Sequence, residues 1–154
     1  MNRINCTRLI LGGLLAGLII DVGAFLIDGL LLADRWAAAM QHLGLPAYAG
    51  LLPNLFLNLS GFLYGIFALW LYANLRPRFG ARPRTAVIAG FATWLCGSLL
   101  ASVVPMALHM LPRRLYSLSI AGALLEIVLG TLAGAWLYKD ARTESAPRTV
   151  ATAA

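Results

Sequence analysis

Two carboxylic acids lie at the centre of long apolar stretches, where acidic side chains are rare and costly. Asp21 is at the centre of the apolar run 9–33, and Glu126 is close to the centre of the run 115–138. An ionised carboxylate in the middle of a bilayer costs at least about 2.5 kcal/mol. No basic residue lies in the middle of an apolar run, so an ion pair within one chain is unavailable. Carboxyl groups that bind and release protons at such a depth suit proton relay or proton-coupled exchange.

Further polar residues recur at spacings of three and four, which keep side chains near one face of a helix. Asp28 continues the stripe of Asp21, and Asn54 and Asn58 form a second stripe in the apolar run 51–75. Together these side chains predict a polar track from one membrane surface down to the central carboxyl groups. The predicted site comprises Asp21, Asp28, Asn54, Asn58, Ser102, His109 and Glu126.

A purely structural role is the alternative for the central carboxyl groups. A neutral acid can be held by a hydrogen bond to a polar neighbour or to a backbone carbonyl. The candidate partners in the other apolar runs are Tyr64, Thr93 and Ser98. The residues alone leave both interpretations open.

The sequence predicts no cofactor, no bound metal and no enzyme motif. A transmembrane haem is favoured by histidines that face each other on separate helices, whereas His42 falls in a loop and His109 near a helix end. The acidic residues and His109 are expected at depths too different to share one metal ion. Cys6 and Cys96 are also expected at different depths, so they should not pair. No nucleotide-binding or hydrolase motif is present.

Composition indicates the elements that position these residues. Of 154 residues, 60% are hydrophobic and only 12% are charged, which is more apolar surface than a soluble protein of this size can bury. Four apolar runs, at 9–33, 51–75, 85–111 and 115–138, are each long enough to cross a bilayer as a helix. We therefore predict an all-α protein with one four-helix transmembrane domain over residues 1–139. The polar segment 140–154 is predicted to be disordered.

The basic residues predict the orientation. Nine of the 12 Lys and Arg residues fall in the N-terminal segment, the second loop and the tail, all on one side of the membrane. The positive-inside rule then places both termini in the cytoplasm of a bacterium, with the chain in the inner membrane. A cleaved signal peptide is disfavoured because the first run is long and carries Asp21 and Asp28. The net charge of +6 is thus a topology signal, and no nucleic-acid partner is predicted.

Small residues predict how the helices pack. Three GxxxG pairs are present, and pairs of this kind let helix backbones approach closely in lipid. Their function is either packing within one chain or a seam between chains in a homo-oligomer or a larger membrane complex. The loop 34–50 carries apolar residues among polar ones and is expected to form a short surface helix. The packing residues are Gly13, Gly17, Gly61, Gly65, Gly130 and Gly134.

Three local features resemble bacterial four-helix inner-membrane proteins of unknown function. They are a Trp-containing segment after the first helix, a short R-P-R turn, and a W-L-Y terminus followed by a basic residue, and the resemblance covers about residues 8–140. It implies a fold and no activity. The small multidrug exporters are similar in having four helices and an essential carboxylate in the first helix. The long first loop and Glu126 depart from that family.

Two functions are therefore expected. The first is a structural or accessory membrane subunit that packs through its glycine faces. The second is a small proton-coupled transporter or channel that uses Asp21 and Glu126.

Overall fold

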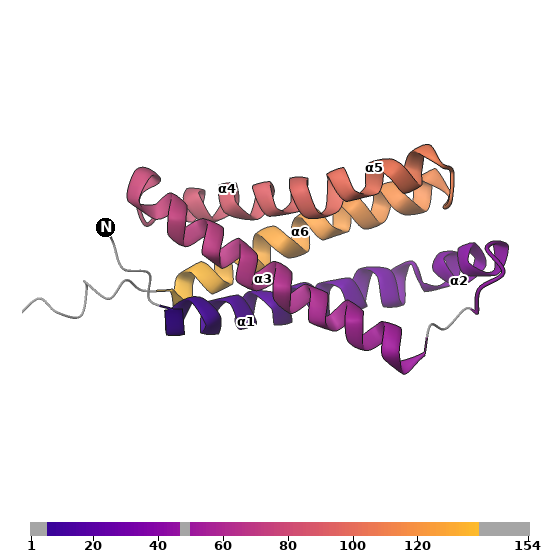
Figure 1. Ribbon diagram of the computed structural model, residues 1–154, viewed down its shortest axis with the longest axis horizontal. Coiled ribbons are helices and arrows are strands. Elements are labelled where there is room, and N and C mark those ends of the chain that lie inside the picture. Colours follow the sequence, from indigo (N-terminus) through magenta and orange to yellow (C-terminus); the bar gives the residue numbers. More distant parts are fainter. Residues whose placement is uncertain (1–5, 47–49, 139–154) are drawn as a thin grey trace, which may run out of the picture.

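The chain forms a bundle of four long helices, seen in a computed structural model that describes residues 6–46 and 50–138 (Figure 1). Within these ranges the regular structure is helical throughout. Four helices are long and apolar enough to cross a membrane: Cys6–Leu31, Leu51–Phe79, Pro83–Ala107 and Arg113–Leu137. This confirms the predicted all-α architecture with four candidate spans. Arg3 and the predicted disordered segment 140–154 lie outside the described residues.

Two of the spans change their winding part of the way along. The first begins as α1 (Cys6–Ala24) and continues as the π-helical segment η1 (Phe25–Leu31). The third begins as α4 (Pro83–Trp94), becomes the π-helical segment η2 (Leu95–Leu99) and ends as α5 (Leu100–Ala107). The wider winding is visible in the hydrogen bond from the Leu32 N–H to the Ile27 carbonyl, five residues back.

The second and fourth spans are single α-helices, and a short helix lies outside the bundle. They are α3 (Leu51–Phe79) and α6 (Arg113–Leu137). The short helix α2 (Ala33–His42) occupies the loop for which a surface helix was expected. We call the end of the bundle that carries α2 the α2 end. The opposite end, where α1 begins and α3 turns into α4, is the arginine end (Figure 1).

The helix boundaries differ from the sequence-based prediction at two turns. The predicted turn 76–84 is shorter, because α3 continues through Pro77 and stops at Gly80, whose φ of 82° ends the helix. The third span ends at Ala107 rather than at residue 111. His109 therefore lies in the loop after α5 with a φ of 53°, and not on the helix where the sequence placed it.

The first helix lies between α3 and α6 and contacts them through two glycine-rich faces. A Cβ atom on Gly13 would lie 2.7 Å from the Cα of Ile66 in α3, so the backbones are in contact there. On the other face, a Cβ on Gly12 would lie 2.8 Å from the carbonyl oxygen of Gly134 in α6. Adjacent glycines thus let α1 approach two neighbours at once, which lipid-embedded helices favour.

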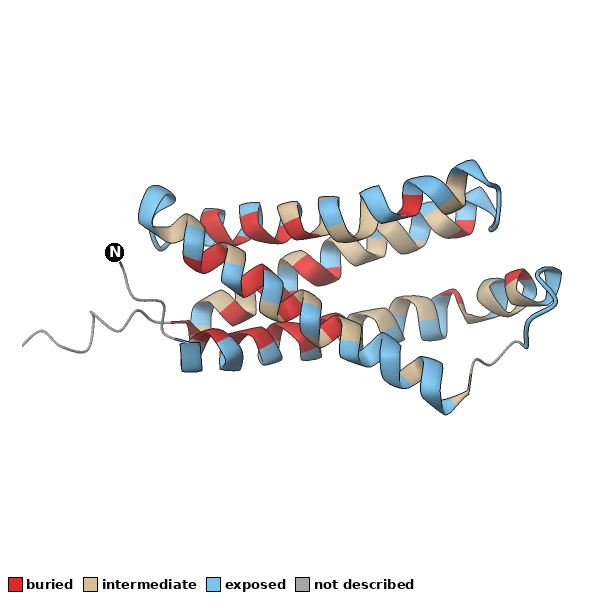
Figure 2. Cartoon of the chain, viewed as in Figure 1, coloured by how far each residue is buried: buried red, intermediate tan, exposed pale blue. Residues whose placement is uncertain are grey.

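Burial is concentrated where these helices converge. Figure 2 shows most buried residues on α1, α3, α4 and α6 in the half of the bundle nearer the arginine end. Ala16, Ala68, Leu69 and Ala86 have no or almost no exposed surface there. The first eight residues of α3 are mostly exposed, because this part of the helix diverges from the bundle (Figures 1 and 2).

Candidate intramembrane carboxyl site

Glu126 is buried in the seam between α6 and the first span. Its exposed fraction is 6%, and its Oε1 atom has no hydrogen-bond partner among the described residues. A Cβ atom on Gly23 would lie 2.5 Å from the Glu126 Cγ, so the side chain lies on the bare backbone of α1 at that glycine. The Glu126 carboxyl group is therefore positioned inside the bundle, and the described residues leave its Oε1 atom without a hydrogen bond.

Asp21 lies in the other seam of α1. A Cβ atom on Gly61 of α3 would overlap the Asp21 Oδ1 and lie 2.7 Å from its Cγ, so this carboxyl lies against the α3 backbone. Its Oδ2 atom is buried and has no hydrogen-bond partner in the described part of the chain. Asp21 thus faces α3, whereas Glu126 faces α1 from α6, so the two carboxyl groups lie in different seams.

Asp28, unlike Asp21 and Glu126, has side-chain hydrogen-bond partners among the described residues. Its Oδ1 accepts a hydrogen bond of 3.0 Å from the Trp36 Nε1 of α2 and one of 2.5 Å from the Ser119 Oγ of α6. The predicted common stripe of Asp21 and Asp28 is not what the structure shows. The π-helical winding of η1 turns each residue through a smaller angle than an α-helix does, and so directs Asp28 toward α6.

The remaining predicted polar residues do not converge on the carboxyl groups. The Asn54 and Asn58 side chains each donate to the carbonyl four residues earlier in their own chain, and Asn58 is exposed. Ser102 is buried but donates to the Leu99 carbonyl. His109 is exposed and accepts a hydrogen bond of 2.6 Å from the Arg113 guanidinium. The predicted track through these residues is not formed.

Two of the partners expected for a structural role are engaged elsewhere. The Tyr64 hydroxyl donates to the Gly97 carbonyl at 2.8 Å, in the middle of η2. The Thr93 hydroxyl donates to the Ala89 carbonyl of its own helix at 2.9 Å. These groups therefore do not supply the hydrogen bonds that would hold a neutral acid at Asp21 or Glu126.

Sequence reasoning missed Ser119 and Gly23 at this site. Ser119, Gly122 and Glu126 are spaced by three and four, so Ser119 could have been found on the same face of α6. Gly23 carries no such signal, because it lies outside the GxxxG pairs. The six predicted packing glycines all lie within the described helices, and each would bring a Cβ to 2.8 Å or less from a neighbouring helix: Gly13, Gly17, Gly61, Gly65, Gly130 and Gly134.

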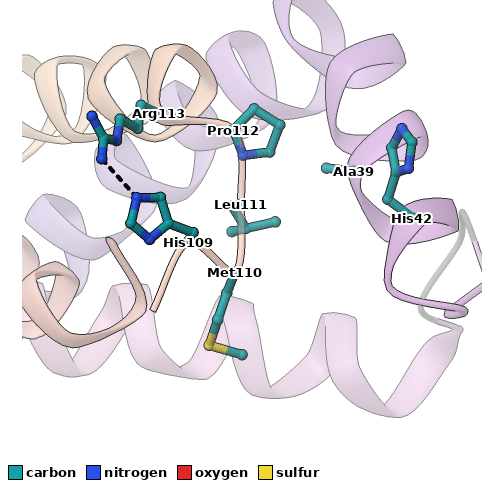
Figure 3. A pocket seen from close by; sticks show the side chains of 7 residues that line it. All are labelled: Ala39, His42, His109, Met110, Leu111, Pro112 and Arg113. Carbon is teal, nitrogen blue, oxygen red and sulfur yellow. Dashed lines mark hydrogen bonds between the residues drawn. The ribbon is translucent and has the colours of Figure 1, made fainter. Parts of the chain in front are cut away.

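A separate pocket at the α2 end contains both histidines. It has a volume of about 450 Å³ and lies between α2 and the loop before α6 (Figure 3). His109 points toward Arg113 on one side, and His42 lies across the pocket on α2. The carboxyl groups of the seam do not line it. Within residues 6–46 and 50–138, no three His, Cys, Asp or Glu side chains are placed to hold a metal ion.

Comparison with known proteins finds no match for this chain. No family model, no curated protein and no solved structure matches it.

Proposed function

We propose that the protein is a small proton-coupled membrane transporter or channel in which two carboxyl groups of the helix seams, those of Asp21 and Glu126, bind and release protons. The observation that carries the proposal is the Glu126 Oε1 atom, which is buried between helices without a hydrogen-bond partner in the described residues. Asp21 Oδ2 is in the same situation on the other face of α1. A buried polar atom that nothing satisfies costs free energy, so a folded protein tolerates it where it has a task.

The surroundings of Glu126 support proton exchange at its carboxyl group rather than a permanent ion pair. Asp28 of the first span is a second carboxyl group that contacts α6, where its Oδ1 accepts a hydrogen bond from Ser119 on the face that also carries Glu126. Unlike charges on neighbouring helices would hold one protonation state, whereas two carboxyl groups in one seam compete for protons. This arrangement favours loading and unloading of a proton at Glu126.

We further propose that the arginine end lies in the cytoplasm of a bacterium and the α2 end in the periplasm. Arg8, Arg76, Arg78, Arg82 and Arg84 are at the arginine end, against Arg35, Arg113 and Arg114 at the α2 end. This imbalance supports an inner-membrane protein with both termini inside, by the positive-inside rule.

The proposal is tested in vesicles loaded with a pH-sensitive dye and carrying the purified protein. An imposed pH difference should be dissipated faster by the protein than by empty vesicles. Asp21→Asn and Glu126→Gln keep size and hydrogen-bonding capacity but remove the titratable proton, so each should reduce the rate to the empty-vesicle value. Circular dichroism of each variant should show unchanged helix content.

The matched control is Asp34→Asn, which removes an exposed carboxylate from α2. This variant should keep the rate of the parent protein. If Asp21→Asn and Glu126→Gln also keep that rate, the two carboxyl groups have no part in proton movement and the proposal is wrong.

A second function is favoured by one observation on α3. Asn58 is exposed on a part of the helix whose other exposed side chains are apolar, including Leu55, Phe56 and Leu59. Amide side chains hydrogen-bond across helices in membranes. This supports an accessory subunit that associates through α3, either with a second copy or within a larger complex.

Native mass measured after gentle detergent extraction distinguishes this second function. Asn58→Leu should convert an oligomer or a complex into a monomer, because it removes the amide. Asn74→Leu is the control, since Asn74 is also exposed on α3 and also donates to the carbonyl four residues earlier. A monomer in the parent protein would exclude association through this face.

A further inference from the structure

Ile27 separates the two groups of carboxyl oxygens in the seam between the first span and α6. A Cβ atom on Gly122 would lie 3.0 Å and 3.1 Å from two carbon atoms of the Ile27 side chain, so Ile27 is seated on this glycine. The same Cβ position lies 3.7 Å from the Glu126 Oε1. The Ile27 side chain therefore packs on Gly122, and the unsatisfied Oε1 of Glu126 lies close to the same glycine.

On the α2 side of Ile27 lies the Asp28–Ser119 pair. The Ser119 Oγ donates to the Asp28 Oδ1, which also accepts from Trp36 of α2. On α6 the order toward the α2 end is Glu126, Gly122, Ser119, with spacings of four and three that keep all three residues on one face. From the α2 end, the order along this seam is therefore Ser119 with Asp28, then Ile27 over Gly122, then Glu126.

We propose that the Ile27 side chain is a hydrophobic gate between the Asp28–Ser119 pair and the buried carboxyl of Glu126, so that water and protons reach Glu126 from the α2 end only when Ile27 leaves Gly122. The inference rests on the proposed function, since it concerns access to the same carboxyl group. An apolar side chain excludes water from the short interval between polar groups, and removing it reconnects them.

The Ile27 side chain is carried by the π-helical part of the first span. Ile27 lies in η1, where backbone hydrogen bonds join residues five positions apart. One example is the hydrogen bond from the Leu32 N–H to the Ile27 carbonyl. Such segments interrupt the regular α-helical ladder and often occur at functional sites. Gly122 leaves room for the side chain in this closed arrangement, and Gly29 follows two residues after Ile27 in η1 itself.

The test compares proton uptake by vesicles carrying Ile27→Ala with uptake by the parent protein. Removing most of the gate should raise the rate of uptake several-fold. Ile27→Val, which shortens the side chain by one methyl group, should give an intermediate rate and serves if Ile27→Ala does not fold. Ile10→Ala is the matched control, because Ile10 is 49% exposed on α1 and faces away from the bundle; its rate should equal that of the parent.

The double variant Ile27→Ala with Glu126→Gln identifies the route. If the added flux passes through Glu126, the double variant should return to the empty-vesicle rate. Flux that persists in the double variant would show a loosened bundle and overturn the gate. An unchanged rate in both Ile27 variants, with Glu126→Gln still inactive, would also overturn the gate but leave the proposed function intact. An active Glu126→Gln in the parent background would instead refute the proposed function.

Discussion

The three acidic side chains of the spans differ in what surrounds them. Asp28 accepts two hydrogen bonds, from Trp36 and Ser119, whereas Asp21 and Glu126 each keep a buried oxygen without a partner in the described residues. A carboxyl oxygen that accepts from two donors fixes the position of the groups that donate to it. Asp28 is thus suited to positioning α2, and the other two acids to chemistry.

Replacing Trp36 tests this positioning role. Trp36→Phe keeps the aromatic ring but removes the N–H that donates to Asp28. A hydrogen bond to a charged group contributes about 1.5–3 kcal/mol. Because the loss of this hydrogen bond lowers the local stability of α2, we expect the backbone amides of α2 to exchange with deuterium faster. The backbone amides of α6 should exchange at the same rate as in the parent protein. Mass spectrometry after partial exchange measures both.

The control for that experiment is Trp136→Phe, which alters a side chain that is 82% exposed at the opposite end of the bundle. It should leave the exchange of α2 unchanged. Equal exchange in the Trp36 variant and the parent would mean that the apolar cluster of Leu32, Ala39 and Leu115 holds α2 without help from Asp28.

Among the helices, α1 is in direct backbone contact with both α3 and α6. Gly130 of α6 faces the α1 backbone, and a Cβ placed on it would lie 2.7 Å from the Ala16 carbonyl oxygen. Backbone cannot yield as a flexible side chain can, so a larger residue must push the helices apart.

Gly130→Leu should therefore lower the free energy of unfolding by about 1–3 kcal/mol, the usual range for overpacking. Denaturation in mixed detergent, followed by circular dichroism, measures the change. Gly29→Ala is the comparison, because its Cβ would first meet the Phe25 side chain, at 3.2 Å. A Gly130 variant as stable as the parent would show that α1 and α6 are not in close contact in the membrane.

The sequence predicted the spans well because each consists of a long apolar run, which in lipid has to form a helix. It located the GxxxG residues for the same kind of reason, since small residues recur at helical spacing. It could not place Asp28, because the π-helical winding of η1 leaves no periodic signal and rotates everything after Ala24. It also overlooked Gly12, although two adjacent glycines can serve two neighbouring helices.

The predicted polar track failed for a local reason. Asn54 and Asn58 satisfy their own amide groups on backbone carbonyls of α3, at hydrogen-bond distances of 2.9 Å and 2.8 Å. Helical spacing shows which residues share a face, but not which helix that face will meet. The divergence of α3 from the bundle, where its first residues are mostly exposed, could not be read from that spacing.

For the whole molecule, the distribution of arginines predicts how the bundle is inserted. A reporter active only in the cytoplasm, fused after Ala154, should be active, and one active only in the periplasm should not. The periplasmic reporter should instead be active when fused within the loop after α2, for example after Gly44. The opposite result at both sites would mean that the bundle is inserted the other way round, with the α2 end in the cytoplasm.

The position of α1 between α3 and α6 also bears on how the protein is made. A ribosome synthesises α1 before α6, yet these two helices share the seam of Gly12, Gly23 and Glu126. Until α6 has entered the membrane, one glycine face of α1 lacks its neighbouring helix. Chains that stop before α6 therefore display an unpaired helix face in the membrane.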